Sequence, residues 1–127
     1  MKYGISKPVN LPFDAAIEKV TAELKTEGFG VLTTIDVKET LKKKLGVEFQ
    51  NYVILGACNP PFAYQSLLAE EEIGLLLPCN VIVYEKEGKT VVSAFDPMVM
   101  TSIIGKDEMR KVAEQVKQRL QRVIDRV

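Results

Sequence analysis

The sequence predicts an α+β protein in which one sheet of five strands carries helices on one face. Two long segments repeat apolar residues with a helical period, and five shorter segments are rich in β-branched and aromatic residues. Glycine, proline, asparagine and aspartate separate these segments, and short helices fall between some of the strands. A chain of 127 residues without repeats or linkers is expected to form a single domain over residues 1–127.

The first third of the chain predicts two strands and a long helix. Residues 1–7 alternate polar and apolar side chains and predict a strand that ends before Pro8. Pro12 opens a helix that stops at Gly28, because a glycine can take a positive φ at a helix end. Residues 29–35 predict the next strand. The buried stripe of the helix is expected to be Phe13, Ile17, Val20 and Leu24.

The middle of the chain predicts a short helix and a strongly apolar strand. Asp36 is placed to cap a helix that carries Glu39 in its first turn and ends at Gly46. Residues 52–57 are almost continuously apolar, which predicts a strand covered on both faces. Asn59 and Pro60 then predict a helix start, with Asn59 as the N-cap. Phe62, Leu67 and Leu68 are expected to face the core.

The last third predicts a hairpin and a long helix. Residues 81–85 form a strand with Val81 and Val83 on one face and Ile82 and Tyr84 on the other. A tight turn at Glu87-Gly88 leads to the return strand at residues 90–95. The final helix is expected to begin with Asp107 as its cap and to run to about residue 126. Its buried stripe is expected to be Met109, Val112, Val116, Leu120, Val123 and Val127.

Composition excludes several classes of function. The 17 basic and 17 acidic residues balance, so the charge favours neither nucleic acid nor an anionic membrane as a partner. No apolar run approaches the ~20 residues of a membrane span, and no secretory leader is present, so a cytoplasmic location is expected. The chain has no histidine, which removes Ser-His-Asp and Cys-His catalysis and histidine-based zinc sites.

The candidate site lies in the apolar stretch from Tyr52 to Lys86, which holds both cysteines, each followed by asparagine.

Four segments of the chain resemble a known family: LPF near the start, EGFGVLTTIDVKETLKKKLG, ILGACNP and GLLLPCNVIVYE. Together they resemble domain-of-unknown-function family 302 of bacteria and archaea over nearly the whole chain. The resemblance implies a TATA-binding-protein-like α+β fold, with β-α, then antiparallel strands, then a helix. It implies no activity, and such a fold is no evidence of DNA binding.

The implied antiparallel order has a consequence for the cysteines. The strand that ends at Cys58 then lies beside the strand that begins near Cys79, so the two Cys-Asn pairs meet at one end of the sheet. Parallel strands would instead separate the pairs by a strand length, about 20 Å for six residues.

Our first hypothesis is a site for a small molecule or for sulfur chemistry. Cys58 precedes a helix start, which favours the thiolate, and a thiolate pair can hold a soft ion such as Cu(I). The asparagines would bind the ligand, and Tyr84 or Tyr52 would stack on it. Buried, unreactive cysteines and capping asparagines are the alternative reading. The proposed ligand-binding residues are Cys58, Asn59, Cys79, Asn80 and Tyr84.

The second hypothesis is a non-catalytic, homodimeric interaction module whose adhesive surface is the apolar segment of residues 98–104. The alternative use of that segment is a lid on the sheet.

The third hypothesis is carboxylate chemistry, for which Asp36, Asp96 and Glu85 are the candidates near strand ends. Their spacing pairs none of them, and capping or turn roles explain the two aspartates. Whether the protein is an enzyme, and which cofactor or ligand it takes, stay open.

Overall fold

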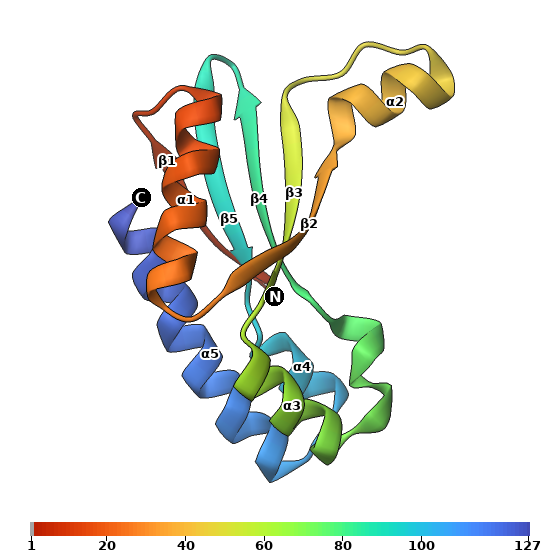
Figure 1. Cartoon of the computed structure of the whole chain (residues 1–127), viewed down its shortest axis with the longest axis vertical. Helices are drawn as coiled ribbons and strands as arrows, with labels where there is room; N and C mark the ends of the chain where they lie inside the picture. Colours follow the sequence, from red (N-terminus) through yellow and green to blue (C-terminus); the bar gives the residue numbers. More distant parts are fainter. Residues whose placement is uncertain (1) are drawn as a thin grey trace.

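The structure is a computed structural model that describes residues 2–127, and it confirms the predicted α+β class. Five antiparallel strands form one open sheet in the spatial order β1-β5-β4-β3-β2. Figure 1 shows the two long helices on one side of this sheet and the short helices beyond its ends. The strands are β1 (Gly4–Val9), β2 (Gly30–Asp36), β3 (Tyr52–Cys58), β4 (Cys79–Lys86) and β5 (Lys89–Phe95).

Two long helices cover one face of the sheet. They are α1 (Phe13–Thr26) and α5 (Asp107–Arg126), and they contact each other as well as the strands. Alternate residues of β3 and β4 point at them, so Leu55, Val81 and Val83 are almost fully buried. The predicted stripe of α1 is confirmed at Val20 and Leu24. Nearly all of the α5 stripe is buried too, and only Val127 is half-buried.

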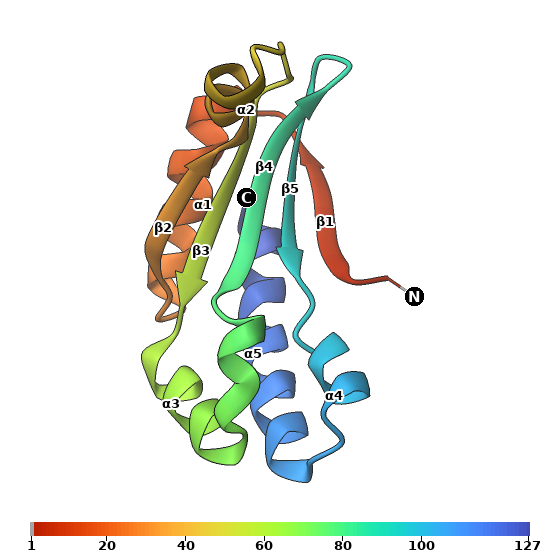
Figure 2. The ribbon, with the colours of Figure 1, turned by 90° about the vertical axis from the view of Figure 1, so that its right-hand side faces the viewer.

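The opposite face of the sheet is not covered by a helix in residues 2–127. Figure 2 looks onto this face and shows the strands in front of α1 and α5. Tyr52 and Ile54 of β3 and Ile82 and Tyr84 of β4 point this way and are only half-buried. The prediction that the Tyr52 strand is covered on both faces is therefore wrong for this chain alone. The alternation predicted for the Val81 strand is confirmed.

The predicted helix ends and the hairpin turn are confirmed in detail. The Asp36 carboxylate accepts a hydrogen bond of 3.0 Å from the Glu39 amide and so caps α2 (Val37–Leu45). Gly28 and Gly46 both have the positive φ that ends a helix. Glu87 and Gly88 both have a positive φ, as this type of two-residue hairpin turn requires.

Some predicted boundaries are wrong. Strand β1 continues through Pro8 to Val9, because it is an edge strand and the missing N–H of Pro8 leaves no ladder bond unmade inside the sheet. Met1, the first residue of that predicted strand, lies outside the described residues. Asp107 is the first residue of α5, and its predicted role as cap is wrong: the residue before the helix is Lys106.

Below the sheet, three short helices pack against the first half of α5. They are α3 (Pro60–Ala69), the 3₁₀ helix η1 (Glu71–Leu76) and α4 (Val99–Ile103). A second small core holds them, built from Ile73, Met100 and Met109. Leu67 and Leu68 of α3 are exposed, so their predicted burial is wrong; Ser66 takes the buried position. No helix in residues 2–127 is long and apolar enough to cross a membrane.

Candidate functional site

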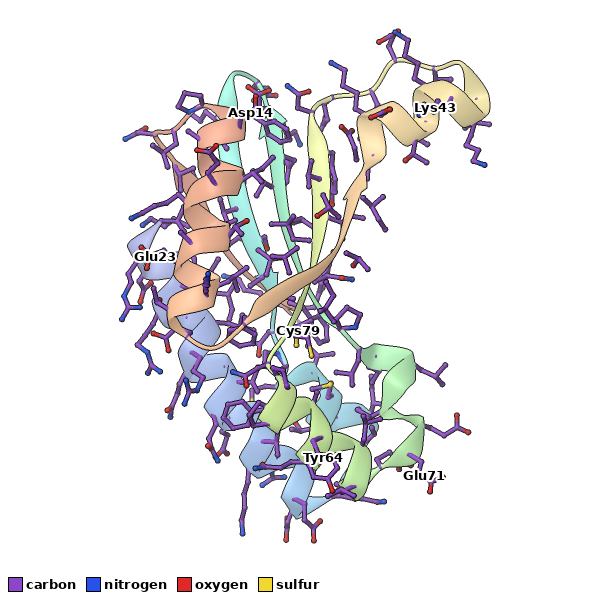
Figure 3. The ribbon with its side chains drawn as sticks, viewed as in Figure 1. Asp14, Glu23, Lys43, Tyr64, Glu71 and Cys79 are labelled. Carbon is purple, nitrogen blue, oxygen red and sulfur yellow. The ribbon has the colours of Figure 1, made fainter. Side chains whose placement is uncertain are left out.

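The two cysteine-bearing segments meet at one end of the sheet, as predicted. Strands β3 and β4 are antiparallel neighbours, and Ala57 pairs directly with Cys79. Cys58 is the next residue of β3, so both thiols lie at the end of the sheet that faces the short helices. Figure 3 labels Cys79 at this junction, between the strands above and α3 and α4 below. Both cysteines are free thiols.

A cavity of 290 Å³ lies at this junction. The end of the sheet forms one side of it, and α3, α4 and α5 form the other. Cys58 and Cys79 line it, together with Phe62, Met100 and Val116. The cavity exists because α5 is longer than the strands. Twenty residues of helix span about 30 Å, whereas seven residues of strand span about 23 Å. The first turns of α5 therefore extend beyond the sheet, and the short helices α3 and α4 pack against them.

The polar side chains at the cavity are already hydrogen-bonded within the protein. The Ser66 hydroxyl donates to the Phe62 carbonyl at 2.8 Å. The Asn59 side-chain amide donates to the Glu27 carbonyl at 3.2 Å and is buried. In the described part of the chain, no buried side-chain nitrogen or oxygen lacks a partner. The cavity therefore offers a ligand mostly hydrocarbon and sulfur surface.

Asn59 ties the start of α3 to the end of α1. It occupies the predicted N-cap position, but its side chain makes no bond to its own helix. Its amide instead reaches the carbonyl of Glu27, which also accepts a bond from Arg119 at 3.2 Å. The Arg119 guanidinium lies over the Phe62 ring, 5.3 Å from its centre. The donor of Asn59, which we expected to serve a ligand, thus holds the wall of the cavity in place.

The two thiols differ in environment. Cys79 is buried and Cys58 is half-buried. Burial, with a smaller contribution from the neighbouring Cys58, raises the pKa of the Cys79 thiol to about 11. Cys79 is therefore a protonated, weakly nucleophilic thiol at neutral pH. No three histidine, cysteine, aspartate or glutamate side chains in residues 2–127 cluster in a way that could hold a metal ion.

Asn80 and Tyr84 do not lie at the cavity. Successive residues of a strand point to opposite faces, so Asn80 points away from Cys79 and is exposed on the open face of the sheet. Tyr84 is on the same open face, where its ring stacks on Tyr52 with centres 5.5 Å apart. The structure thus brings together Cys58, Asn59 and Cys79 of the five predicted site residues. The strand period, already visible in the sequence, separates the other two.

The three candidate carboxylates have structural partners and do not line the cavity. Asp36 caps α2, and Asp96 accepts bonds from the Met98 amide at 2.9 Å and from Lys117 at 2.9 Å. Glu85 accepts a bond from the Asn51 side chain. These three groups lie in separate contacts and do not form a catalytic pair.

Several cavity residues were missed by the sequence analysis. Val112 and Val116 belong to a stripe that predicted packing on the sheet, and Met100 was assigned to a lid or an adhesive surface. Their positions at the cavity follow from the overhang of α5 beyond the sheet, which no local pattern indicates. Phe62 was expected in the core, and it lies at the edge of that core and lines the cavity.

Fold and site together define a small α+β protein with one open antiparallel sheet and an apolar, thiol-lined cavity at the end of that sheet. The family model for the domain of unknown function DUF302 matches residues 5–127, and the chain belongs to that family. It is similar to the crystal structure of an uncharacterized conserved DUF302 protein from Bacillus stearothermophilus, with 31% identity and a TM-score of 0.92. The match covers 99% of this chain and 98% of that one. No curated protein matches the chain.

Proposed function

We propose that the protein binds a small apolar molecule in the cavity between the end of the sheet and helices α3, α4 and α5. The observation that carries the proposal is the cavity itself, with its apolar wall and its internally satisfied polar groups. An apolar cavity of about 150 Å³ is enough to hold benzene. A volume of 290 Å³ therefore accommodates a two-ring molecule such as indole or naphthalene, or a short alkyl chain.

The thiols set the chemistry of the wall. Sulfur is polarisable and forms favourable contacts with aromatic rings. Cys79 stays protonated at neutral pH, so it contributes surface and not a nucleophile. A sulfur-handling version of the site therefore depends on Cys58, the more accessible thiol. Phe62, held by Arg119, offers an aromatic face on the other side of the cavity.

A titration with indole tests the binding. We expect saturable changes in the amide signals of Cys58, Phe62 and Cys79 in nitrogen–proton correlation spectra. The variant Ala63→Phe fills the cavity from α3 and should abolish them. The variant Gln65→Phe adds the same side chain at an exposed position of the same helix and should leave them unchanged. Indole, naphthalene and 1-hexanol all failing to give saturable shifts would refute the proposal.

Thiol labelling separates simple binding from sulfur chemistry. Iodoacetamide should modify Cys58 in the native protein, and saturating indole should slow that modification if the ligand occupies the cavity. If Cys58 is as inert as Cys79 in the native protein, the sulfur-handling version is lost and simple apolar binding stands. The variant Cys58→Ser should retain indole binding within about tenfold, because one sulfur–aromatic contact contributes about 0.3–1.5 kcal/mol.

The Met98–Ile104 segment does not support the interaction module that was the alternative hypothesis. Met100 is buried against Ile73 and Met109, so the segment serves as a lid over the second core. Ile103 is the large apolar residue of the segment that stays exposed. A homodimer stays a prediction, and it needs another surface.

A further inference from the structure

The open face of the sheet is a second apolar surface, separate from the cavity. Cross-strand pairing builds two rows across it. One row runs through Ile35, Ile54 and Ile82, and the other through Tyr52, Tyr84 and Val91. None of these side chains is fully buried, whereas their neighbours on the helix-covered face, such as Val81 and Val92, are completely buried. Strands β3 and β4 are therefore apolar on both faces but covered on one.

Helix α2 and the loop after it project from one end of the sheet on the side of this open face (Figure 1). None of the nine residues of α2 is buried. Isolated helices shorter than about 12 residues are marginal in water, so such a helix normally depends on packing. Its apolar residues repeat along one side, and Leu45 at its end is 69% exposed. Val47 and Phe49 of the following loop are exposed as well. We call residues 37–49 the arm.

We infer that the open face and the arm are the two halves of a homodimer interface, in which the arm of each copy packs on the open face of the other. A two-fold axis makes such contacts reciprocal, so one chain can supply both the groove and the helix that fills it. Within one chain α2 begins at the residue directly after β2 and leads away from the sheet, so the helix does not cover its own open face. The loop of the arm reaches that face at Phe49, whose ring centre lies 6.2 Å from that of Tyr52.

The chemistry of the face favours a second copy over other occupants. Its central residues, Ile54, Ile82 and Tyr84, carry no charge, and the lysines on this side, Lys86 and Lys89, stand at the hairpin end of β4 and β5. The centre of the face therefore lacks the cations that bind nucleic acid or an anionic membrane. Of the four lysines of the arm, Lys42 and Lys43 are engaged with Glu48 and Glu39, and Lys38 and Lys44 are exposed. The arm carries four lysines and two glutamates, so its fit to the open face rests on the apolar residues of both and not on charge.

The area also suits a stable dimer. Five strands about 4.8 Å apart, each about 20 Å long, have a flat footprint of about 500 Å², and a nine-residue helix adds about 140 Å². Accessible area exceeds a flat footprint because side chains make the surface rough. A standard interface buries about 800 Å² per partner, so face and arm together reach the required size.

Sedimentation velocity on the full chain from 1 to 100 μM is the test, and we expect a dimer. Leu45→Lys on the arm and Ile35→Lys on the face change side chains that are 69% and 46% exposed, so both variants should fold, as checked by circular dichroism. Each should raise the dimer dissociation constant roughly tenfold or more, because the new charge would be buried without a partner. Ile103→Lys and Leu75→Lys change residues that are 63% and 81% exposed on other surfaces and should leave the dimer intact.

Photo-crosslinking locates the contact. A benzophenone side chain placed at Leu45 should link to residues of β3, β4 or β5 in another copy, identified by mass spectrometry of mixed light and heavy chains. A wild-type chain that stays monomeric at 100 μM overturns the inference, and so does a monomeric chain that binds neutral phosphatidylcholine vesicles through this face. A dimer that resists Leu45→Lys but dissociates with Ile103→Lys also overturns it, in favour of the α4 surface. These outcomes leave indole binding in the cavity unaffected.

Discussion

Replacing Glu27 by glutamine tests the ionic contact that joins the end of α1 to α5. The Glu27 side chain is only 8% exposed. Its carboxylate accepts hydrogen bonds from Arg122 at 2.8 and 3.2 Å and from Arg126 at 2.8 Å. Arg119 lies further away, at 3.9 Å. The variant Glu27→Gln keeps the shape of the side chain and removes the charge that holds the arginines.

The loss of stability follows from the exposure of the partners. A hydrogen bond to a charged group contributes about 1.5–3 kcal/mol when both partners are buried. The side chains of Arg122 and Arg126 are 47% and 45% exposed, so water takes over part of their solvation once the carboxylate is gone, and screening lowers the value toward that of a surface pair. We expect Glu27→Gln to lower the free energy of unfolding by about 1–2 kcal/mol at pH 7.

The effect should depend on pH with a definite sign. The hydrogen bond from Arg122 lowers the pKa of the Glu27 carboxyl most; burial opposes it, and the hydrogen bond from Arg126 adds to the lowering, so the net shift is downward. A depressed carboxyl pKa stabilises the folded state above the unfolded pKa, about 4.3, and that contribution is lost as the pH falls through the folded pKa. The difference between wild type and Glu27→Gln should therefore be constant from pH 7 to about 5 and shrink below about pH 4.

Urea denaturation followed by circular dichroism at pH 7, 5 and 3.5 measures this difference. With a slope of about 1.5 kcal/mol per molar urea, the expected loss moves the midpoint by about 1 M. The control is Glu39→Gln, which removes an equivalent charge from an exposed pair with Lys43 and should change stability by less than about 0.5 kcal/mol. A Glu27→Gln midpoint equal to that of the control, or a difference that persists unchanged at pH 3.5, would refute the reasoning.

Three further predictions concern the end of the sheet. Gly56→Ala should lower the free energy of unfolding by about 1–3 kcal/mol, because its Cβ would overlap the Thr33 hydroxyl; adding Thr33→Ala should restore part of the loss in urea denaturation, and an unchanged midpoint for the single variant contradicts this. Asn59→Asp should destabilise more than Asn59→Ala in thermal unfolding at pH 7, since it turns a carboxylate toward the Glu27 carbonyl that now accepts a bond; equal losses contradict this. Cys79 should resist iodoacetamide at pH 8 in the native protein but react in 8 M urea, because burial raises its pKa to about 11; equal rates in the two states contradict this.

Local pattern determined most of the secondary structure. The apolar stripe of α1, the cap at Asp36, the glycines at helix ends and the Glu87-Gly88 turn each depend on residues within a few positions of one another, and each is confirmed. The errors lie where a neighbour from elsewhere in the chain decides. Pro8 is accommodated because β1 is an edge strand, which depends on sheet order. Leu67 and Leu68 are exposed because α3 turns Ser66 inward.

The candidate site shows the same division. By itself, the sequence determined that two cysteines sit at strand ends and that β3 and β4 are apolar on both faces. The family resemblance implied that these strands are antiparallel neighbours, and this pairing is confirmed. Tertiary structure alone decided that α5 extends past the sheet and encloses a cavity there, and that the amide of Asn59 bonds to Glu27. The reason is physical: a helix period or a strand alternation is encoded by adjacent residues, whereas a cavity and its hydrogen bonds depend on how elements of unequal length pack.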